Sequence, residues 1–185
     1  MKKIGLILVI LLMITFGVWA TTDASSTLKI STSVEDKFGL VIHTEDDPVD
    51  YSDFMGLGSN AVGTTDDPVS FDDTDINNES ERVLTVSAMT NKTSGYEIGV
   101  IANPLSAQGV STKIGYTVRI LGTPDTVVSV SDSDSNKTFN LKEFNAPGGL
   151  FIISQKFGIT IDQEGWENAG AGDYSTTWTV NLTTT

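Results

Sequence analysis

Gly172-Asp173-Tyr174-Ser175-Thr176-Thr177-Trp178-Thr179-Val180-Asn181-Leu182-Thr183 is the stretch that decides the fold. Its larger side chains alternate with small polar ones, so one face carries Tyr174, Thr176, Trp178, Val180 and Leu182. A period of two in a segment rich in β-branched and aromatic residues predicts a half-buried β-strand. Such a strand needs partners from earlier in the chain, so we expect it to complete a sheet that the preceding residues supply.

The same alternation recurs upstream. It predicts strands at 38–43, 82–88, 96–102, 114–120 and 126–130, and 150–161 is long enough for one bent strand or for two. Turn-forming residues separate these segments. We therefore expect an all-β protein, an immunoglobulin-like antiparallel β-sandwich with no substantial helix after the first 20 residues. Its predicted core consists of Leu40, Ile42, Val86, Tyr96, Ile98, Val100, Ile114, Tyr116, Val118, Ile120, Ile159, Tyr174, Trp178 and Val180.

An acidic region at 44–81 interrupts the alternation. It contains no Lys or Arg, and Asp-Asp-Pro-Val occurs in it twice, at 46–49 and 66–69. Pro cannot donate to a strand ladder, so the Val49-Asp50-Tyr51 and Val69-Ser70-Phe71 segments that follow are interpreted as short edge strands. We expect a long acidic loop region within a single domain, 27–185.

The first 20 residues have the pattern of a secretory signal peptide. Lys2 and Lys3 precede an apolar run at 4–16, and the small residues Val18 and Ala20 suit cleavage after Ala20. An uncleaved membrane anchor is the alternative, but the run is short for a span. Residues 21–26 are small and polar, which is typical of a disordered linker. The prediction is an extracytoplasmic protein of the periplasm, the cell surface or a fimbrium.

Charge and composition exclude several partners. The chain has 11 Lys and Arg against 24 Asp and Glu; without the two signal-peptide lysines, 9 − 24 gives a net charge of −15. Such a surface repels nucleic acid and anionic membranes, and we expect no membrane insertion after signal cleavage. The chain has no Cys, so disulfides are excluded and packing must hold the fold. The di-lysine signal and the lack of disulfides suggest a bacterial protein.

Both ends carry a family pattern. An alternating segment at 27–34 is followed by Phe38-Gly39-Leu40-Val41-Ile42, and Ala171-Gly172-Asp173-Tyr174-Ser175 leads into the final strand. Together with Ser94-Gly95-Tyr96, these segments resemble fimbrial subunits of the chaperone–usher type, especially spore coat protein U-like and alternate-class major pilins. The acidic region is longer than in that family, and the cysteines of the spore coat U-like subunits are missing.

The resemblance implies a mode of assembly. Each subunit of such a fibre lacks one strand of its sandwich, and the N-terminal strand of the next subunit fills the gap by β-strand addition. The inserted side chains would be Leu28, Ile30, Thr32 and Val34. The implied partners are other fibre subunits, a periplasmic chaperone and an outer-membrane usher. The alternative is that 27–34 is an ordinary first strand, paired within its own domain.

Calcium is the one cofactor that the acidic residues suggest. Asp132, Asp134, Asn136 and Glu143 have the spacing of positions 1, 3, 5 and 12 of a calcium loop, but Lys137 occupies the position that needs Gly. A second candidate is the carboxylate cluster that includes Asp46, Asp47, Asp66 and Asp67. The alternatives are a polar hairpin tip and a solvated loop.

The remaining residues favour binding or assembly over catalysis. Trp166 lies in a polar loop, where it would stack on a sugar ring or close an end of the sandwich. His43 is the sole histidine, no nucleophile-elbow motif is present, and we expect no enzyme activity. The predicted function is a structural or adhesive subunit of a bacterial surface fibre or coat. The alternatives are a secreted carbohydrate- or calcium-binding module and, third, a hydrolase with two carboxylates.

Overall fold

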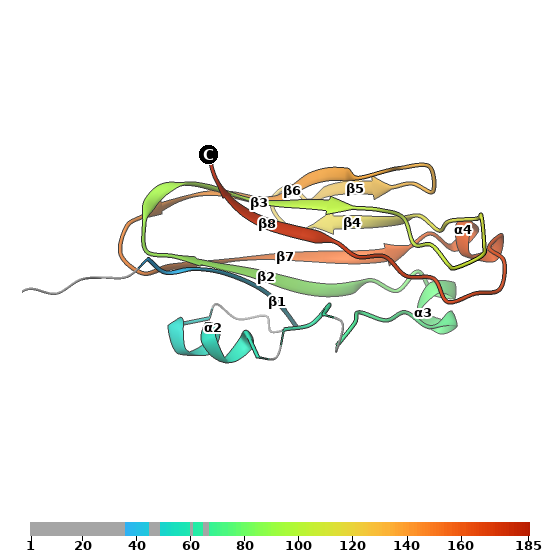
Figure 1. Cartoon of the computed structure of the whole chain (residues 1–185), viewed down its shortest axis with the longest axis horizontal. Helices are drawn as coiled ribbons and strands as arrows, with labels where there is room; N and C mark the ends of the chain where they lie inside the picture. The colour runs from blue at the N-terminus through green and yellow to red at the C-terminus, as the bar shows by residue number, and fades with distance from the viewer. Residues whose placement is uncertain (1–35, 45–48, 60, 65–66) are drawn as a thin grey trace, which may run out of the picture. The chain divides into compact units, whose positions relative to one another are not determined.

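The structure is a computed structural model that describes residues 36–44, 49–59, 61–64 and 67–185 (Figure 1). The predicted signal peptide, the linker at 21–26 and the alternating segment at 27–34 lie outside the described residues. Asp46, Asp47 and Asp66 of the second calcium candidate also lie outside them. All statements below concern the described part of the chain.

Antiparallel β-structure dominates this part, with 47% of it in strands and 12% in helices. The all-β prediction is therefore confirmed at the level of fold class. None of the described helices is both long and apolar enough to cross a membrane. The elements in chain order are β1 (Phe38–His43), α2 (Tyr51–Leu57), α3 (Asp73–Asn77), β2 (Arg82–Thr90), β3 (Thr93–Ala102), β4 (Tyr116–Ile120), β5 (Thr126–Val130), β6 (Lys137–Pro147), β7 (Phe151–Ile161), α4 (Gln163–Glu167) and β8 (Thr179–Thr184).

The strands form two sheets (Figure 1). The first has the order β1-β2-β7-β4-β5 and the second the order β6-β3-β8, and every pairing is antiparallel. Five strands that the sequence predicts appear within two or three residues of the expected bounds. The sequence left open whether the apolar segment at 150–161 forms one strand or two. It forms one strand, β7. β6 was not assigned from the sequence.

Alternation places one face of each central strand in a common core. In β3, Tyr96, Ile98, Val100 and Ala102 are at most 2% exposed, as their period of two predicts. Buried side chains of β2, β4 and β7 from the first sheet join those of β3 and β6 from the second in one apolar cluster. Every residue of the predicted core belongs to this cluster, packs against it or, in the case of Tyr96, is buried beside it.

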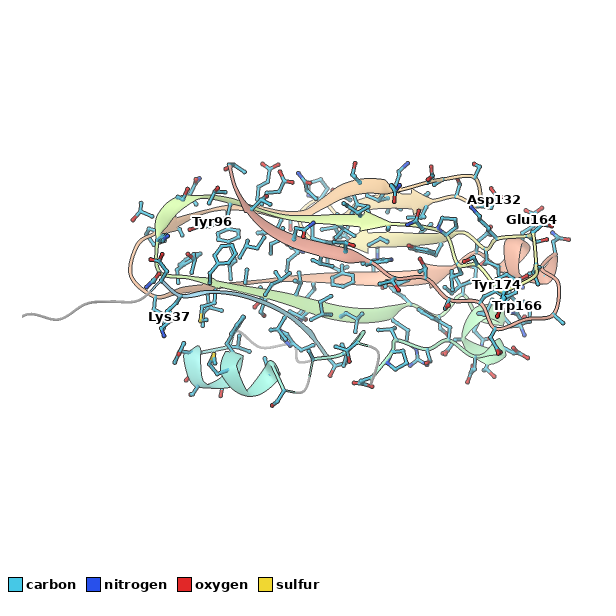
Figure 2. All side chains as sticks on the ribbon, in the orientation of Figure 1. Lys37, Tyr96, Asp132, Glu164, Trp166 and Tyr174 are labelled. Carbon is cyan, nitrogen blue, oxygen red and sulfur yellow. The ribbon has the colours of Figure 1, made fainter. Side chains whose placement is uncertain are left out.

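An aromatic row crosses the end of the core where β2 turns into β3 and β6 into β7. Ring centroids are 6.0 Å apart between Phe38 and Tyr96, 5.4 Å between Tyr96 and Phe144, and 5.9 Å between Phe144 and Phe151. Figure 2 labels Tyr96 at this end of the sheets. The phenol of Tyr96 lies 3.0 Å from the hydroxyl of Thr90, which satisfies both buried polar groups. These rings come from four strands and join the two sheets.

The acidic region differs from the expected loop and edge strands. Tyr51 begins helix α2, and residues 69–71 form no strand. Each of the two helices of this region has an Asp as its N-cap. The Asp50 carboxylate accepts from the N–H of Asp53, and Asp72 forms a capping box with Asp75. Helices of seven and five residues have too few turns to show a 3.6-residue apolar period, which is why periodicity missed them.

Helix α2 covers the outer face of the β1–β2 pair. Phe54 and Leu57 of the helix pack with Val41, Val49 and Met89 in a second apolar cluster. The approach is close at Gly39, because a Cβ atom there would lie 2.9 Å from the Phe54 ring. β1 is thus packed on both sides, by the main core and by part of the acidic region.

The final strand is shorter than predicted. β8 begins at Thr179, although exposure alternates as expected from Tyr174 onward. The preceding residues run beside the loop after β3, where Ser106 and Ser175 form an isolated bridge and the Thr176 hydroxyl donates to the Asn103 carbonyl at 2.8 Å. This segment faces a loop instead of a strand, so the ladder does not extend over it.

Candidate functional site

β8 is one of the two edge strands of the three-stranded sheet. It pairs with β3 from Tyr96↔Thr184 to Ile101↔Thr179, and no other strand of the described residues pairs with it. The backbone N–H and C=O groups along its second side therefore have no strand partner within that part of the chain. Such an edge is a template for another strand.

β1 is an edge strand of the other sheet and lies near β8 (Figure 1). It pairs with β2 over six residues, from Phe38↔Thr90 to His43↔Thr85. Its second side is partly covered, because the N–H of Val62 donates to the carbonyl of Ile42 at 3.0 Å. The cover lies at the C-terminal end of β1 and comes from the acidic region.

The burial of β1 is the reverse of what a covered sheet shows. Leu40 and Ile42 pack against the main core, yet they are only partly buried. Val41 and His43 face away from that core and are 5% and 1% exposed, because the acidic region covers them. Phe38, at the start of the strand, is 55% exposed. The main core is therefore incompletely covered beside β1.

β8 shows the matching pattern. Val180 and Leu182 pack against the main core and remain partly exposed, whereas the alternate residues face solvent. We call this region the β1–β8 edge and define it by Phe38, Leu40 and Ile42 of β1 and Val180 and Leu182 of β8. It combines partly exposed apolar side chains with an edge strand whose second side has no strand partner among the described residues. Both features are typical of protein interaction sites.

The direction of the strands at this edge follows from the pairing. β1 is antiparallel to β2, the two-residue connection after β2 reverses the chain into β3, and β3 is antiparallel to β8. β1 and β8 therefore run in opposite directions. A strand placed between them is parallel to one and antiparallel to the other.

A hydrogen-bonded aromatic group fixes the chain just before β8. The indole N–H of Trp178 donates to the Tyr116 hydroxyl at 2.7 Å, and that hydroxyl donates to the Asn103 carbonyl at 2.9 Å. The Trp178 ring also packs against Phe139 and Phe157, with centroids 5.8 Å away in each case. Burial raises the pKa of Tyr116 to about 12, and the Trp178 hydrogen bond partly opposes that shift. The start of β8 is thereby tied to both sheets.

The first calcium candidate is not gathered into one cluster. The Asp134 carboxylate accepts from the N–H of Ser131 at 2.8 Å, which together with nearby Lys137 lowers the pKa of Asp134. Asn136 has a positive φ of 53° in the β5–β6 turn, and Glu143 lies on strand β6. Among the described residues, no group of three His, Cys, Asp or Glu side chains is placed to hold a metal ion. Calcium binding stays a prediction.

The other predicted site residues are dispersed. Asp67, the described member of the second calcium candidate, accepts at its carbonyl from the N–H of Gly63. Trp166 lies on α4 and is partly buried against the main core (Figure 2). The imidazole of His43 is buried, with Nε2 2.7 Å from the Ser87 hydroxyl. Trp166 thus packs against the main core, and sugar stacking by this residue stays a prediction.

The sequence predicts Leu40, Ile42 and Val180 as core residues, but it does not indicate that they are only partly buried within the described part of the chain. Alternation indicates which face of a strand is apolar, but it carries no information on whether a neighbouring strand covers that face. In comparisons with known proteins, no family model matches the chain and no curated protein matches it.

Proposed function

We propose that this protein is a structural subunit of an exported bacterial fibre or coat. In this proposal, the two sheets form an immunoglobulin-like sandwich that is open at the β1–β8 edge. The alternating segment of a second copy completes it as a strand beside β8, with Leu28, Ile30, Thr32 and Val34 facing the core. Export would use residues 1–20, and a periplasmic chaperone and an outer-membrane usher are the proposed assembly partners.

The reversed burial of β1 carries the proposal. On this strand the core-facing Leu40 and Ile42 are more exposed than Val41 and His43, which face outward. One more strand beside β8 would cover the first pair, together with Val180 and Leu182. It would also pair with the side of β8 that has no strand partner among the described residues. Burial of a large apolar side chain contributes about 1.5–3 kcal/mol, so the edge favours an apolar alternating strand.

Strand direction distinguishes donation between copies from pairing within one chain. Three residues, 35–37, separate the alternating segment from β1, so a return within the same chain requires a tight hairpin. In such a hairpin the segment is antiparallel to β1 and therefore parallel to β8. A segment from another copy is free to run antiparallel to β8, which is the slightly more stable arrangement per residue. This difference favours donation between copies.

Engineered cysteines test the proposal cleanly because the chain has no Cys. One tagged preparation carries Lys29→Cys, Ser31→Cys or Ser33→Cys, on the solvent face of the donated strand. A second preparation, with a different tag, carries Asn181→Cys on the exposed face of β8. The two are mixed, assembled and oxidised, and a disulfide-linked product with both tags on a non-reducing gel supports donation between copies.

The control replaces Asn181→Cys with Val127→Cys, an exposed position on β5 at the other end of its sheet. This pair is expected to give no specific product. If the mixture of single variants yields no mixed product, while the double variant in one chain closes an internal disulfide, the segment pairs in its own chain and the assembly mechanism is wrong. A chain that begins at Asp36 lacks the alternating segment. If donation between copies is correct, adding this segment back as a peptide should restore assembly of the shortened chain.

A further inference from the structure

A recess with hydroxyl and charged groups in its lining lies at the end of the first sheet, away from the β1–β8 edge. It has a volume of about 480 Å³ and is formed by β4, β5, the end of β7 and the start of α4. Figure 2 labels Asp132 and Glu164, which both line it, at this end of the sheets. The volume is within the range of pockets that bind small molecules, and the walls combine polar groups with apolar surface.

A row of hydroxyl groups crosses the recess. Ser129 of β5 is directly opposite Thr117 of β4, and Thr117 is directly opposite Thr160 of β7. All three side chains line the recess, on the face of the sheet away from the core. Adjacent strands are about 4.8 Å apart, so the row extends for roughly 10 Å, comparable to the length of a disaccharide. Each hydroxyl can both donate and accept a hydrogen bond, as sugar hydroxyls do.

Charged and amide groups surround this row. Asp162 and Glu164 come from the start of α4, Asp132 from the turn after β5, and Lys113 from the segment before β4. Three carboxylates and one ammonium group make the recess anionic, within a chain whose net charge is −13. An anionic ligand is therefore disfavoured, whereas a neutral or amine-bearing ligand is not.

Closely packed backbone forms the floor of the recess. The N–H of Asp162 donates to the Gly115 carbonyl at 3.1 Å, which joins the end of β7 to the start of β4. A Cβ atom at Gly115 would lie 2.9 Å from the carbonyl oxygen of Val130, so these backbones are in close contact. The hydroxyl row comes from three hydrogen-bonded strands, so its backbone is in place before any ligand arrives, which lowers the entropic cost of binding.

We propose that this recess binds a neutral or amine-bearing saccharide of about two sugar units, with Thr117, Ser129 and Thr160 hydrogen-bonding its hydroxyls. The site lies apart from the β1–β8 edge and does not depend on strand donation. A fibre subunit with such a site would contact glycans along its length.

Amide chemical shifts of the full ¹⁵N-labelled chain test the proposal. The probes are the β-1,4-linked disaccharides of N-acetylglucosamine and of glucosamine, with a hyaluronan disaccharide as the anionic comparison. We expect saturable shifts at residues 115–118, 129–132 and 160–165 with the neutral probe, the amine-bearing probe or both. We expect none with the anionic probe. The first two probes also distinguish recognition of the hydroxyls alone from recognition of an amine.

Two variants check the residues. Thr117→Val with Thr160→Val keeps both β-branched shapes and removes two hydroxyls, which should weaken binding by roughly tenfold. Thr126→Val, on β5 but outside the recess, should leave binding unchanged. Asp162→Asn should reduce any preference for the amine-bearing probe. Absence of shifts with both favoured probes, equal binding of the anionic one, or full affinity of the double valine variant would overturn the proposal.

Discussion

Replacement of Trp178 by Phe tests how the start of β8 is held. The change removes the indole N–H that donates to the Tyr116 hydroxyl at 2.7 Å, while the Tyr116 hydroxyl keeps its own bond to the Asn103 carbonyl. The smaller ring also loses part of its packing against Phe139 and Phe157. Two separable losses are therefore expected, one polar and one apolar.

Their sizes follow from the geometry. A short, well-directed side-chain hydrogen bond has a net value of about 1 kcal/mol. The three heavy atoms that Phe lacks correspond to roughly two methylene groups; because Trp178 is only partly buried, their loss costs about 1 kcal/mol. Trp178→Phe should therefore lower the free energy of unfolding by about 2 kcal/mol. Trp166→Phe is the matched control and should show the apolar loss alone, about 1 kcal/mol.

Urea unfolding followed by circular dichroism measures these differences, provided that the slope with denaturant is unchanged. A double-mutant cycle with Tyr116→Phe isolates the hydrogen bond and should give a coupling energy of about 1 kcal/mol. A coupling energy within about 0.3 kcal/mol of zero would refute the assigned bond, since neighbouring residues in one network normally couple by more. Equal costs for the two Trp variants would refute the polar part of the argument.

Three further predictions concern the titration of Tyr116, the packing of helix α2 and the close backbone contact at Gly115. Burial raises the pKa of Tyr116 to about 12. The contribution of the neutral Tyr116 phenol to stability is therefore fully present below pH 10 and is lost as the pH rises from 10 toward 12. The pH dependence of the urea midpoint in this range should shrink in Tyr116→Phe. Phe54→Ala removes the side chain that anchors α2, so limited proteolysis should cut residues 49–59 faster. The global free energy of unfolding should fall by less than the loss of about 3–5 kcal/mol that is typical of a main-core Phe. If the free energy for opening residues 49–59 and the global free energy of unfolding fall equally, α2 unfolds only with the core. Gly115→Ala brings a Cβ to 2.9 Å from the Val130 carbonyl oxygen and should destabilise the fold by about 1–3 kcal/mol in thermal melts. Gly122→Ala is the control, because its Cβ would make an ordinary contact at 3.4 Å. Its stability should stay within about 0.5 kcal/mol of that of the unchanged chain.

The strands were predictable because their alternation is strong and local. Tyr96 to Ala102 and Tyr174 to Leu182 each alternate in sequence and in exposure, since side chains of a strand point to opposite faces whatever its partner is. The turns were equally clear, because Asn-Lys after β2 and Pro-Gly-Gly at the end of β6 favour reversal of the chain.

The helices and the β1–β8 edge were harder to predict from the sequence. The caps at Asp50 and Asp72 are readable in the sequence as an Asp three residues before another Asp, but the density of acids in this region obscured the signal. The exposure of Leu40 and Ile42 depends on which strands are neighbours, and strand order is a long-range property that a local pattern does not encode. The recess beside β4 is likewise made by residues from three strands and a helix, and none of these residues stands out in its own segment.

The double cover of β1 has a mechanical consequence. A pull along the axis of β1 loads the six β1–β2 residue pairs in shear, all at once, and not one after another as in unzipping. Helix α2 resists the same displacement through the fit of Phe54 over Gly39. Sliding β1 by one residue would turn its apolar set to the opposite face. The strand is thus built to stay in place under a pull along its length.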